Sequence, residues 1–176
     1  ATVANLALKP TWYQKWVVHR RGRPEELCGR VHLELTKRAE SPLHRDILGA
    51  EAVRIVRPQR GSYLLPQAFP EGCPSHPSYP AAHAVIAGAC ATVLKACFAE
   101  SWELPQPVVA TRDGLALEPY TGPPLTVGGE LDKLAQNIAI GRNFAGVHWR
   151  SDGIEGISFG EEFAIRFLRE AKVTAN

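Results

Sequence analysis

The sequence has no strong net charge, no long apolar run and no closely paired cysteines. Its formal net charge is +2, which gives no reason to expect a nucleic acid or a membrane surface as partner. Apolar runs stay well below the roughly 20 residues of a membrane span, and the first residues do not resemble a signal peptide. The four cysteines contain no C-x-x-C pair. Their usage leans weakly toward a reducing compartment, and we therefore expect a cytoplasmic protein.

Signals for β-strands are also few, and the chain has no internal repeat or low-complexity segment. With 45% hydrophobic and 22% charged residues, its 176 residues suit one soluble domain. Apolar periodicity and helix start and stop signals predict a mainly helical fold. The expected helices cover residues 5–21, 24–38, 81–98, 129–145 and 152–170, with a loop over about 57–80 and a short β-ribbon near 108–127.

Two of the expected helices have an apolar face at helical spacing. The face of 129–145 consists of Leu131, Leu134, Ala135, Ile138 and Ala139. In 152–170, the residues expected to point inward are Ile154, Ile157, Phe163 and Phe167.

The stretch "HPSYPAAHA" at residues 76–84 sets two histidines, His76 and His83, around a stiff turn. Proline is favoured just before a first helical turn, so Pro80 predicts a helix start that places His83 in that turn. Free backbone N–H groups and the helix dipole favour an anion there. The two interpretations are therefore a site for an oxyanion and a helix start against which the histidine simply packs.

Three basic side chains occur at a suggestive spacing. Lys15 and Arg23 lie in "KWVVHRRGRPEE", and Arg142 opens "RNFAGVHWRSD", which also contains His148 and Asp152. Taken singly, each is a weak signal, because a lone arginine on a helix usually faces solvent.

Together, the blocks Lys15–x7–Arg23–Pro24, Pro80-Ala81-Ala82-His83 and Arg142–x5–His148–x3–Asp152 resemble the signature of the vanadium-dependent haloperoxidases. This superfamily also contains phosphatidic-acid-type acid phosphatases. The seven-residue spacer and the early His76 resemble the algal and bacterial haloperoxidase branch. "KWVVHRRGRPEELCGRVH" and "ATVLKACF" resemble the bacterial members more than the algal ones. The resemblance runs from residue 12 to about 168.

The resemblance implies an all-α fold, a helical bundle of the vanadium haloperoxidase and type 2 acid phosphatase kind. Residues 1–176 would be its cofactor-bearing carboxy-terminal domain, with long loops. The implied cofactor is vanadate, and phosphate, an isosteric oxyanion, could occupy the same site. The implied partners are hydrogen peroxide, a halide and a small organic substrate, with no nucleic acid and no membrane.

The same resemblance implies a role for each site residue. Lys15, Arg23 and Arg142 would hold the oxygens of the oxyanion, helped by the backbone N–H of Ala82. His148 would bind the metal through one ring nitrogen while Asp152 orients the other. His83 would act as general acid–base, and His76 would modulate peroxide binding or halide choice.

The chain departs from the family pattern in two ways. The family usually has Pro-Ser-Gly-His, so Ala81 lacks a hydroxyl that would bond an equatorial oxygen and help to polarise peroxide. Members are also normally much longer, and this chain starts without methionine. We therefore expect the amino-terminal part of the bundle as a separate chain or a missing segment. An apolar face left open would be covered by that part or by another copy.

Four functions follow as hypotheses. The first is a vanadate-dependent haloperoxidase that halogenates an aromatic or terpenoid natural product. The second is a repurposed isomerase that rearranges an α-hydroxyketone with the site histidines, which the missing hydroxyl at Ala81 suggests. The third is an acid phosphatase with His148 as nucleophile and His83 as acid. The fourth is a non-catalytic scaffold, against which the complete set of cations argues.

Overall fold

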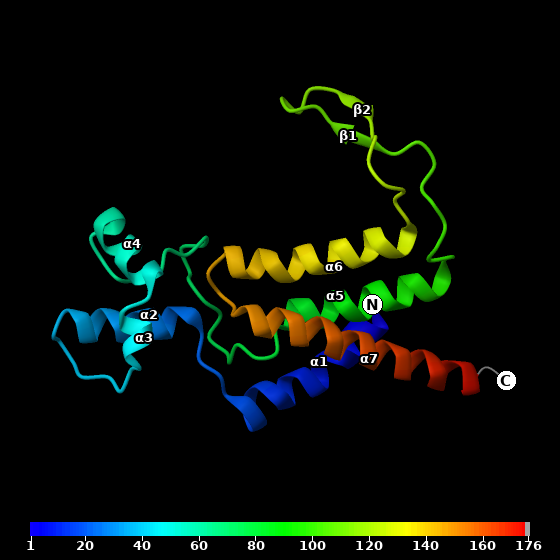
Figure 1. Cartoon of the computed structure of the whole chain (residues 1–176). Helices are drawn as coiled ribbons and strands as arrows, with labels where there is room; N and C mark the ends of the chain where they lie inside the picture. The colour runs from blue at the N-terminus through cyan, green and yellow to red at the C-terminus, as the bar shows by residue number, and fades with distance from the viewer. Residues whose placement is uncertain (175–176) are drawn as a thin grey trace.

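Helix α5 (Ala82–Cys97) is the centre of a helical bundle. The computed structural model describes residues 1–174, with side chains through residue 172. Around α5 pack α1 (Thr2–Tyr13), α6 (Val127–Phe144) and α7 (Arg150–Thr174), and each of these three contacts it (Figure 1). The fold is all-α apart from one short ribbon, as predicted.

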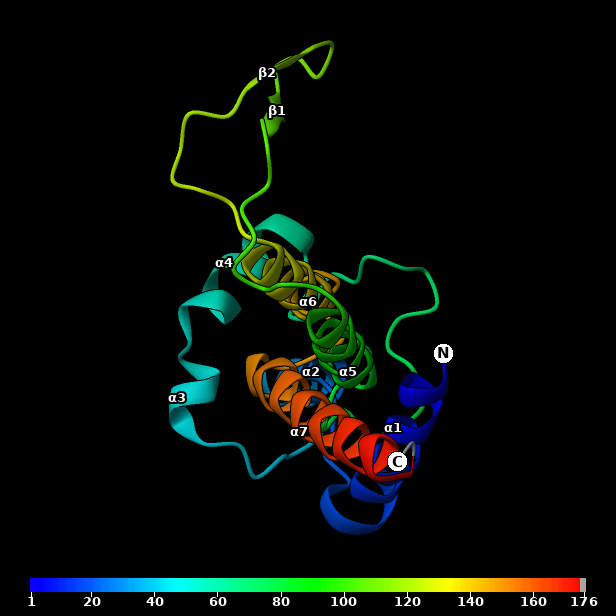
Figure 2. The same cartoon turned by 90° about the vertical axis from the view of Figure 1, so that its right-hand side faces the viewer.

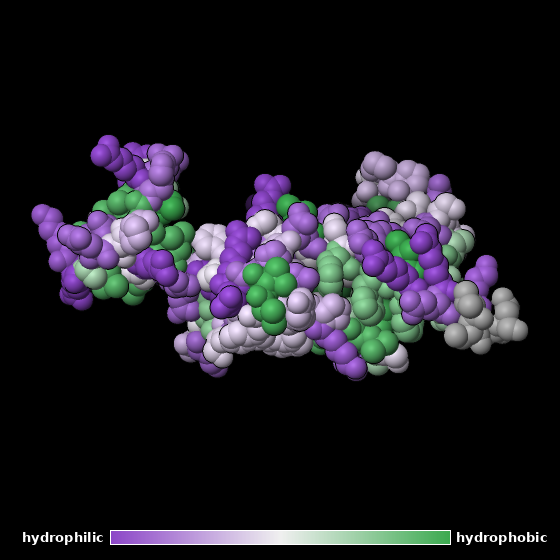
Figure 3. Space-filling view, turned by 90° about the horizontal axis from the view of Figure 1, so that it is seen from below, coloured by the Kyte–Doolittle hydropathy of each residue, from purple (hydrophilic) through white to green (hydrophobic). Residues whose placement is uncertain are grey.

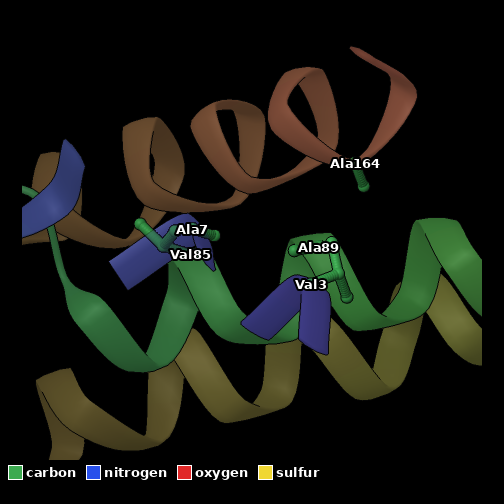
Figure 4. Packing of buried hydrophobic residues seen from close by; sticks show 5 residues of the cluster. All are labelled: Val3, Ala7, Val85, Ala89 and Ala164. Atoms are coloured by element: carbon green, nitrogen blue, oxygen red, sulfur yellow. The ribbon is translucent and has the colours of Figure 1, made fainter. Parts of the chain in front are cut away.

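Small buried side chains let these helices approach closely. The main core cluster joins α1, α5 and α7 through Val3, Ala7, Val85, Ala89 and Ala164 (Figure 4). Larger, partly buried side chains pack against this cluster, among them Phe163 and Phe167. The predicted inward direction of these two residues is confirmed. Ile157 packs against a second cluster.

The contact between α5 and α7 depends on glycine. A Cβ placed on Gly160 would overlap the carbonyl oxygen of Val85 and lie 2.8 Å from the Ala89 nitrogen. Likewise, a Cβ on Gly156 would lie 2.8 Å from the Cβ of Ala84 and 3.0 Å from the Ala81 oxygen. Both helices are thus in backbone contact beside the turn that carries His83, which places the start of α5 firmly against α7.

Two parts of the chain extend away from the bundle. One is a lobe of α2 (Pro24–Leu35), α3 (Arg45–Leu48) and α4 (Glu51–Arg60). The other is an arm in which β1 (Val108–Ala110) pairs antiparallel with β2 (Leu117–Pro119) (Figures 1 and 2). The arm confirms the predicted ribbon, and every residue of both strands is exposed.

Several expected boundaries differ from the structure. The helix expected over 5–21 begins at Thr2 and changes at Gln14 into a π-helical turn, η1 (Gln14–His19), where the Arg20 N–H donates to the Lys15 oxygen at 3.0 Å. Helices α3 and α4 are absent from the predicted set, and residues 57–60 are helical rather than loop. Helix α4 contains Pro58, a residue that in the sequence indicates a loop.

Three large apolar residues on the two predicted apolar faces are exposed, and for Ile154 this contradicts the predicted inward direction. Leu134 is 55%, Ile138 39% and Ile154 53% exposed. The side of α6 that is buried is lined by Gly128, Ala135 and Ala139, because only small side chains fit the close contact. The larger residues beside them form an open apolar surface, and Figure 3 shows further apolar surface on the lobe and on the underside of the bundle.

None of the helices within residues 1–174 has the length and apolar character needed to cross a membrane.

Candidate active site

One end of the bundle gathers the residues singled out in the sequence from four separate segments. Lys15 lies in η1, Arg23 precedes α2, His76 lies in the loop before α5, and His148 joins α6 to α7. Gly146 lets the chain turn between α6 and His148, because its φ of +76° is readily adopted only by glycine. Segments far apart in the sequence thus meet at one end of the fold.

Lys15 is fully buried and tied to the loop before α5. Its Nζ donates to the carbonyl oxygens of Pro77 at 2.7 Å and Ser78 at 3.0 Å. Burial and the nearby charge of Arg23 lower the pKa of Lys15 to about 7, although the Asp152 carboxylate opposes that shift. A buried cation bonded only to neutral carbonyls is available to balance an anion.

Arg23 connects the other segments. Its Nε donates to the His76 oxygen at 2.9 Å, and Nη1 donates to the Val147 oxygen at 2.6 Å. The same guanidinium lies 3.3 Å from His148 Nε2 and 3.2 Å from His76 Nδ1. Only 5% of Arg23 is exposed, so a buried guanidinium connects the buried His148 with the half-buried His76.

His148 has its two ring nitrogens in different surroundings. Nδ1 lies 2.9 Å from Asp152 Oδ2, while Nε2 faces Arg23. Burial lowers the pKa of His148, as do the charges of Arg23 and Lys15, against the opposing effect of the Asp152 hydrogen bond and charge. We therefore assign the Nδ1–H as the donor to Asp152, which makes Nε2 an acceptor that the Arg23 guanidinium faces at 3.3 Å.

Asp152 is fully buried in the first turn of α7. Burial alone would raise its pKa, but hydrogen bonds from His148 and from the Trp149 N–H, together with the charges of His148 and Arg21, hold the pKa below its ordinary value. Asp152 is thus an ionised carboxylate whose hydrogen bond to Nδ1 orients the His148 ring.

His83 and Arg142 complete the group. His83 lies in the first turn of α5 as predicted, with an exposed side chain. Partial desolvation and the charges of Arg142 and Lys15 lower the pKa of His83. The Nε of Arg142 is buried and has no hydrogen-bond partner among the described residues.

His76 lies at the edge of this group. Its Nδ1 is 3.1 Å from the Pro77 oxygen, and its ring meets Trp12 edge-on at 4.9 Å. Burial first, with the charges of Lys15, Arg23 and His148, lowers the pKa of His76. The imidazole is therefore neutral at pH 7 and can accept or donate a hydrogen bond.

The site has an excess of positive charge. Lys15, Arg23 and Arg142 outnumber the two nearby carboxylates, Asp152 and Glu25, and the bonds of Asp152 are already made. Within the described residues no group of three or more His, Cys, Asp or Glu side chains could hold a metal cation. Such a site suits a metal that arrives as an oxyanion, because cations and N–H donors bind its oxygens and one imidazole completes the set.

A family model described as the VCPO second helical-bundle domain matches residues 7–176. The chain belongs to the vanadium haloperoxidase family.

Two algal bromoperoxidases are similar in sequence to this chain over nearly its whole length. A vanadium-dependent bromoperoxidase of Ascophyllum nodosum is 42% identical over 97% of this chain, and one of Corallina officinalis is 43% identical over 98%. The homohexameric structure of the second vanadate-dependent bromoperoxidase of A. nodosum superposes with a TM-score of 0.80 and 34% identity, covering 94% of this chain. The chain spans about a third of the length of these proteins. A closer likeness to bacterial members stays a prediction, since these relatives are algal.

The position at which the family usually has a serine, and this chain has Ala81, is buried. Ala81 is fully buried in a cluster with Ala84 and Ala139. Its N–H donates to the backbone carbonyl oxygen of Asp152 at 3.0 Å. It is the N-cap residue of α5 and makes no side-chain cap. Ala82, the first residue of α5, has an N–H without an intrahelical acceptor, as the first turn of any helix does.

Sequence reasoning missed Arg21 and Trp149. Arg21 donates to Asp152 Oδ1 at 3.1 Å, and the Trp149 N–H donates to Oδ2 at 3.0 Å, while the Trp149 indole N–H donates to the Gly22 oxygen at 2.8 Å. Their only signal was adjacency to the motifs, in "HRRGRP" and "VHWRSD". That signal could not separate Arg21 from its neighbour Arg20.

We expect the affinity for sulfate, an oxyanion that does not titrate in this range, to fall as pH rises from about 7 to about 9. Lys15 has a folded pKa of about 7, and a bound anion favours its charged form and raises that pKa, so affinity is lost as the proton leaves. Titration calorimetry at several pH values measures this effect.

Lys15→Met should weaken sulfate binding by about 10-fold or more at pH 7, the worth of a charge-assisted hydrogen bond, and should remove the pH dependence. Lys9→Met, which removes an exposed lysine of α1, serves as the control. A variant at Lys15 that keeps the same pH dependence would show that another group causes it.

Proposed function

We propose that this chain carries the vanadate site of a haloperoxidase that uses hydrogen peroxide to oxidise a halide and halogenate a small organic substrate. The observation that supports this most is His148, whose Nδ1 is held by Asp152 and whose Nε2 faces the Arg23 guanidinium, with the charge of Lys15 also acting on the ring. The names of the relatives, all vanadium-dependent bromoperoxidases, point the same way.

The chain's own residues would divide the binding of vanadate among them. His148 would hold the vanadium through Nε2, and Lys15, Arg23 and Arg142 would balance the charge of the oxygens. The N–H groups at the start of α5, that of Ala82 first, add donors along the positive end of the helix dipole. When bound, vanadate would supply Lewis acidity that polarises peroxide.

His83 is the residue proposed to move the proton. Its lowered pKa leaves the imidazole neutral at pH 7, so it can accept the proton that peroxide loses on binding. The neighbouring cations, Arg142 and Lys15, that lower the pKa would also make the protonated form a strong acid. His76, bonded to the Arg23 guanidinium, would tune peroxide or halide binding from the side.

Residues 1–176 are proposed as one domain of a longer enzyme or of an oligomer. The apolar side chains exposed on α6 and α7 support a covering partner: Leu134, Ile138, Ile140, Ile154 and Ile165. The similar A. nodosum enzyme is a homohexamer, and this chain spans about a third of its length. An amino-terminal bundle or a second copy would meet this need, and we place the whole in the cytoplasm.

The experiment that tests this function is bromide oxidation with a dye-type halogen acceptor. With vanadate and peroxide present we expect turnover, and withholding either should abolish it, because no imidazole can oxidise a halide. Conversion of an α-hydroxyketone without vanadate or peroxide would instead support the isomerase, and hydrolysis of a phosphate ester would support the phosphatase. Neither alternative is favoured by the relatives.

A further inference from the structure

Arg21 contacts the buried carboxylate that orients His148, from the side opposite the imidazole. Its Nη1 donates to Asp152 Oδ1 at 3.1 Å and to the Ser151 hydroxyl at 2.8 Å. Asp152 Oδ2 accepts from His148 and from the Trp149 N–H. Both oxygens of Asp152 are therefore bonded, and each on its own side of the carboxylate.

The Arg21 side chain is itself held in place. Its guanidinium lies 5.9 Å from the centre of the Tyr79 ring and 5.8 Å from that of Trp149, at distances typical of cation–π contacts. The backbone adds to this, because the Ser78 N–H donates to the Arg21 oxygen at 2.9 Å. The arginine thus joins the segment before α2, the loop before α5 and the first turn of α7.

We propose that Arg21 is a positioning residue of the vanadate site, acting through Asp152 on the direction in which His148 presents Nε2. This inference rests on the proposed function. A carboxylate bonded through one oxygen can rotate about its Cβ–Cγ bond, and the imidazole that it holds turns with it. With Arg21 on Oδ1, that rotation breaks a charge-assisted hydrogen bond.

The same contact has a second effect. Without Arg21, Oδ1 of the fully buried Asp152 loses its one side-chain donor among the described contacts, and the carboxylate must find another partner or shift. Either movement displaces the group that fixes His148. The Arg21 side chain is 41% exposed, but the Asp152 side chain is fully buried. The loss of this ion pair therefore affects a buried carboxylate, whereas the loss of a pair exposed on both sides would cost little.

The test compares the binding of two oxyanions to the intact chain. Orthovanadate would engage His148 directly, whereas inorganic phosphate depends on the cations and N–H groups alone. We expect Arg21→Gln to weaken vanadate binding by about 10-fold or more, as outer-shell partners of metal ligands do, and phosphate binding much less. Arg21→Lys should recover part of the vanadate affinity, since it restores a donor without the planar fork.

Arg30→Gln is the matched control, because it removes one positive charge from an exposed ion pair with Glu26 on α2. It should leave the ratio of vanadate to phosphate affinity unchanged. An equal loss of both affinities in Arg21→Gln would overturn the proposal, since it would show only a general electrostatic effect. Unchanged vanadate binding would overturn it as well.

A double-mutant cycle shows whether Arg21 acts through Asp152. In an Asp152→Asn background, Arg21→Gln should have no further effect on vanadate binding, because the group that it positions is already altered. Additive losses would contradict the proposal. If the unmodified chain binds phosphate but no vanadate, the proposed function fails instead, and the two outcomes are distinguished by the wild-type measurement.

Discussion

Replacing His148 with alanine is expected to abolish vanadate binding and, with it, any vanadate-dependent bromide oxidation. His148 offers a buried imidazole nitrogen, Nε2, that faces Arg23, while the Asp152 carboxylate fixes the ring with its proton on Nδ1. Loss of a residue that only orients a metal ligand costs about 10- to 100-fold in affinity, and loss of the ligand should exceed that range. Equilibrium dialysis with vanadate and the bromide assay measure the two effects.

His44→Ala is the control, since His44 is exposed on the outlying lobe at the start of α3. It should bind vanadate as the unmodified chain does. The His148→Ala variant should still bind phosphate, because Lys15, Arg23 and Arg142 remain. Retained vanadate binding without His148 would contradict the assignment of this residue as the metal ligand.

Replacing Gly160 with alanine should strongly destabilise the bundle. The added Cβ would overlap the Val85 carbonyl oxygen and crowd the Ala89 nitrogen, and these atoms belong to helix backbone, which cannot rotate away. Helices α5 and α7 would have to separate. We expect a loss of about 3 kcal/mol in the free energy of unfolding, the upper end of the range for overpacked cores, measured by urea denaturation.

Gly141→Ala provides the opposite result from the same chemical change. Gly141 is an exposed residue of α6, and a Cβ added to it would meet no other atom within 4 Å. Alanine should therefore stabilise by up to about 1 kcal/mol through its higher helix propensity. Equal stability of the two variants would show that the α5–α7 contact is looser than the structure indicates.

Local signals in the sequence are enough to place most helices. Pro24 with two following acids marks the start of α2, and Pro80 marks the start of α5, because these residues favour a first helical turn in any context. Helix α4 is missed because Pro58 and Gly61 are typical of loops. Its Val53 is half-buried, and no residue of α4 is fully buried.

The apolar periodicity predicts which residues share a face but not which face is buried. On α6 it groups Leu131, Ala135 and Ala139 with Leu134 and Ile138, yet Leu134 and Ile138 are exposed. Burial depends on how closely α5 and α7 approach α6. On α7, Gly153 allows such an approach, since a Cβ added to it would lie 3.4 Å from the Cβ of Ala139.

By itself, the sequence determined the helical class, the presence of three cations and two histidines at family spacing, and the placement of His83 in a first helical turn. These depend on residue type and short-range spacing. Only the tertiary structure decided that Nε2 of His148 faces Arg23 and that Arg21 bonds the far oxygen of Asp152. Such contacts join segments from opposite ends of the chain, between residues more than 120 positions apart, so no local preference of the sequence could show them.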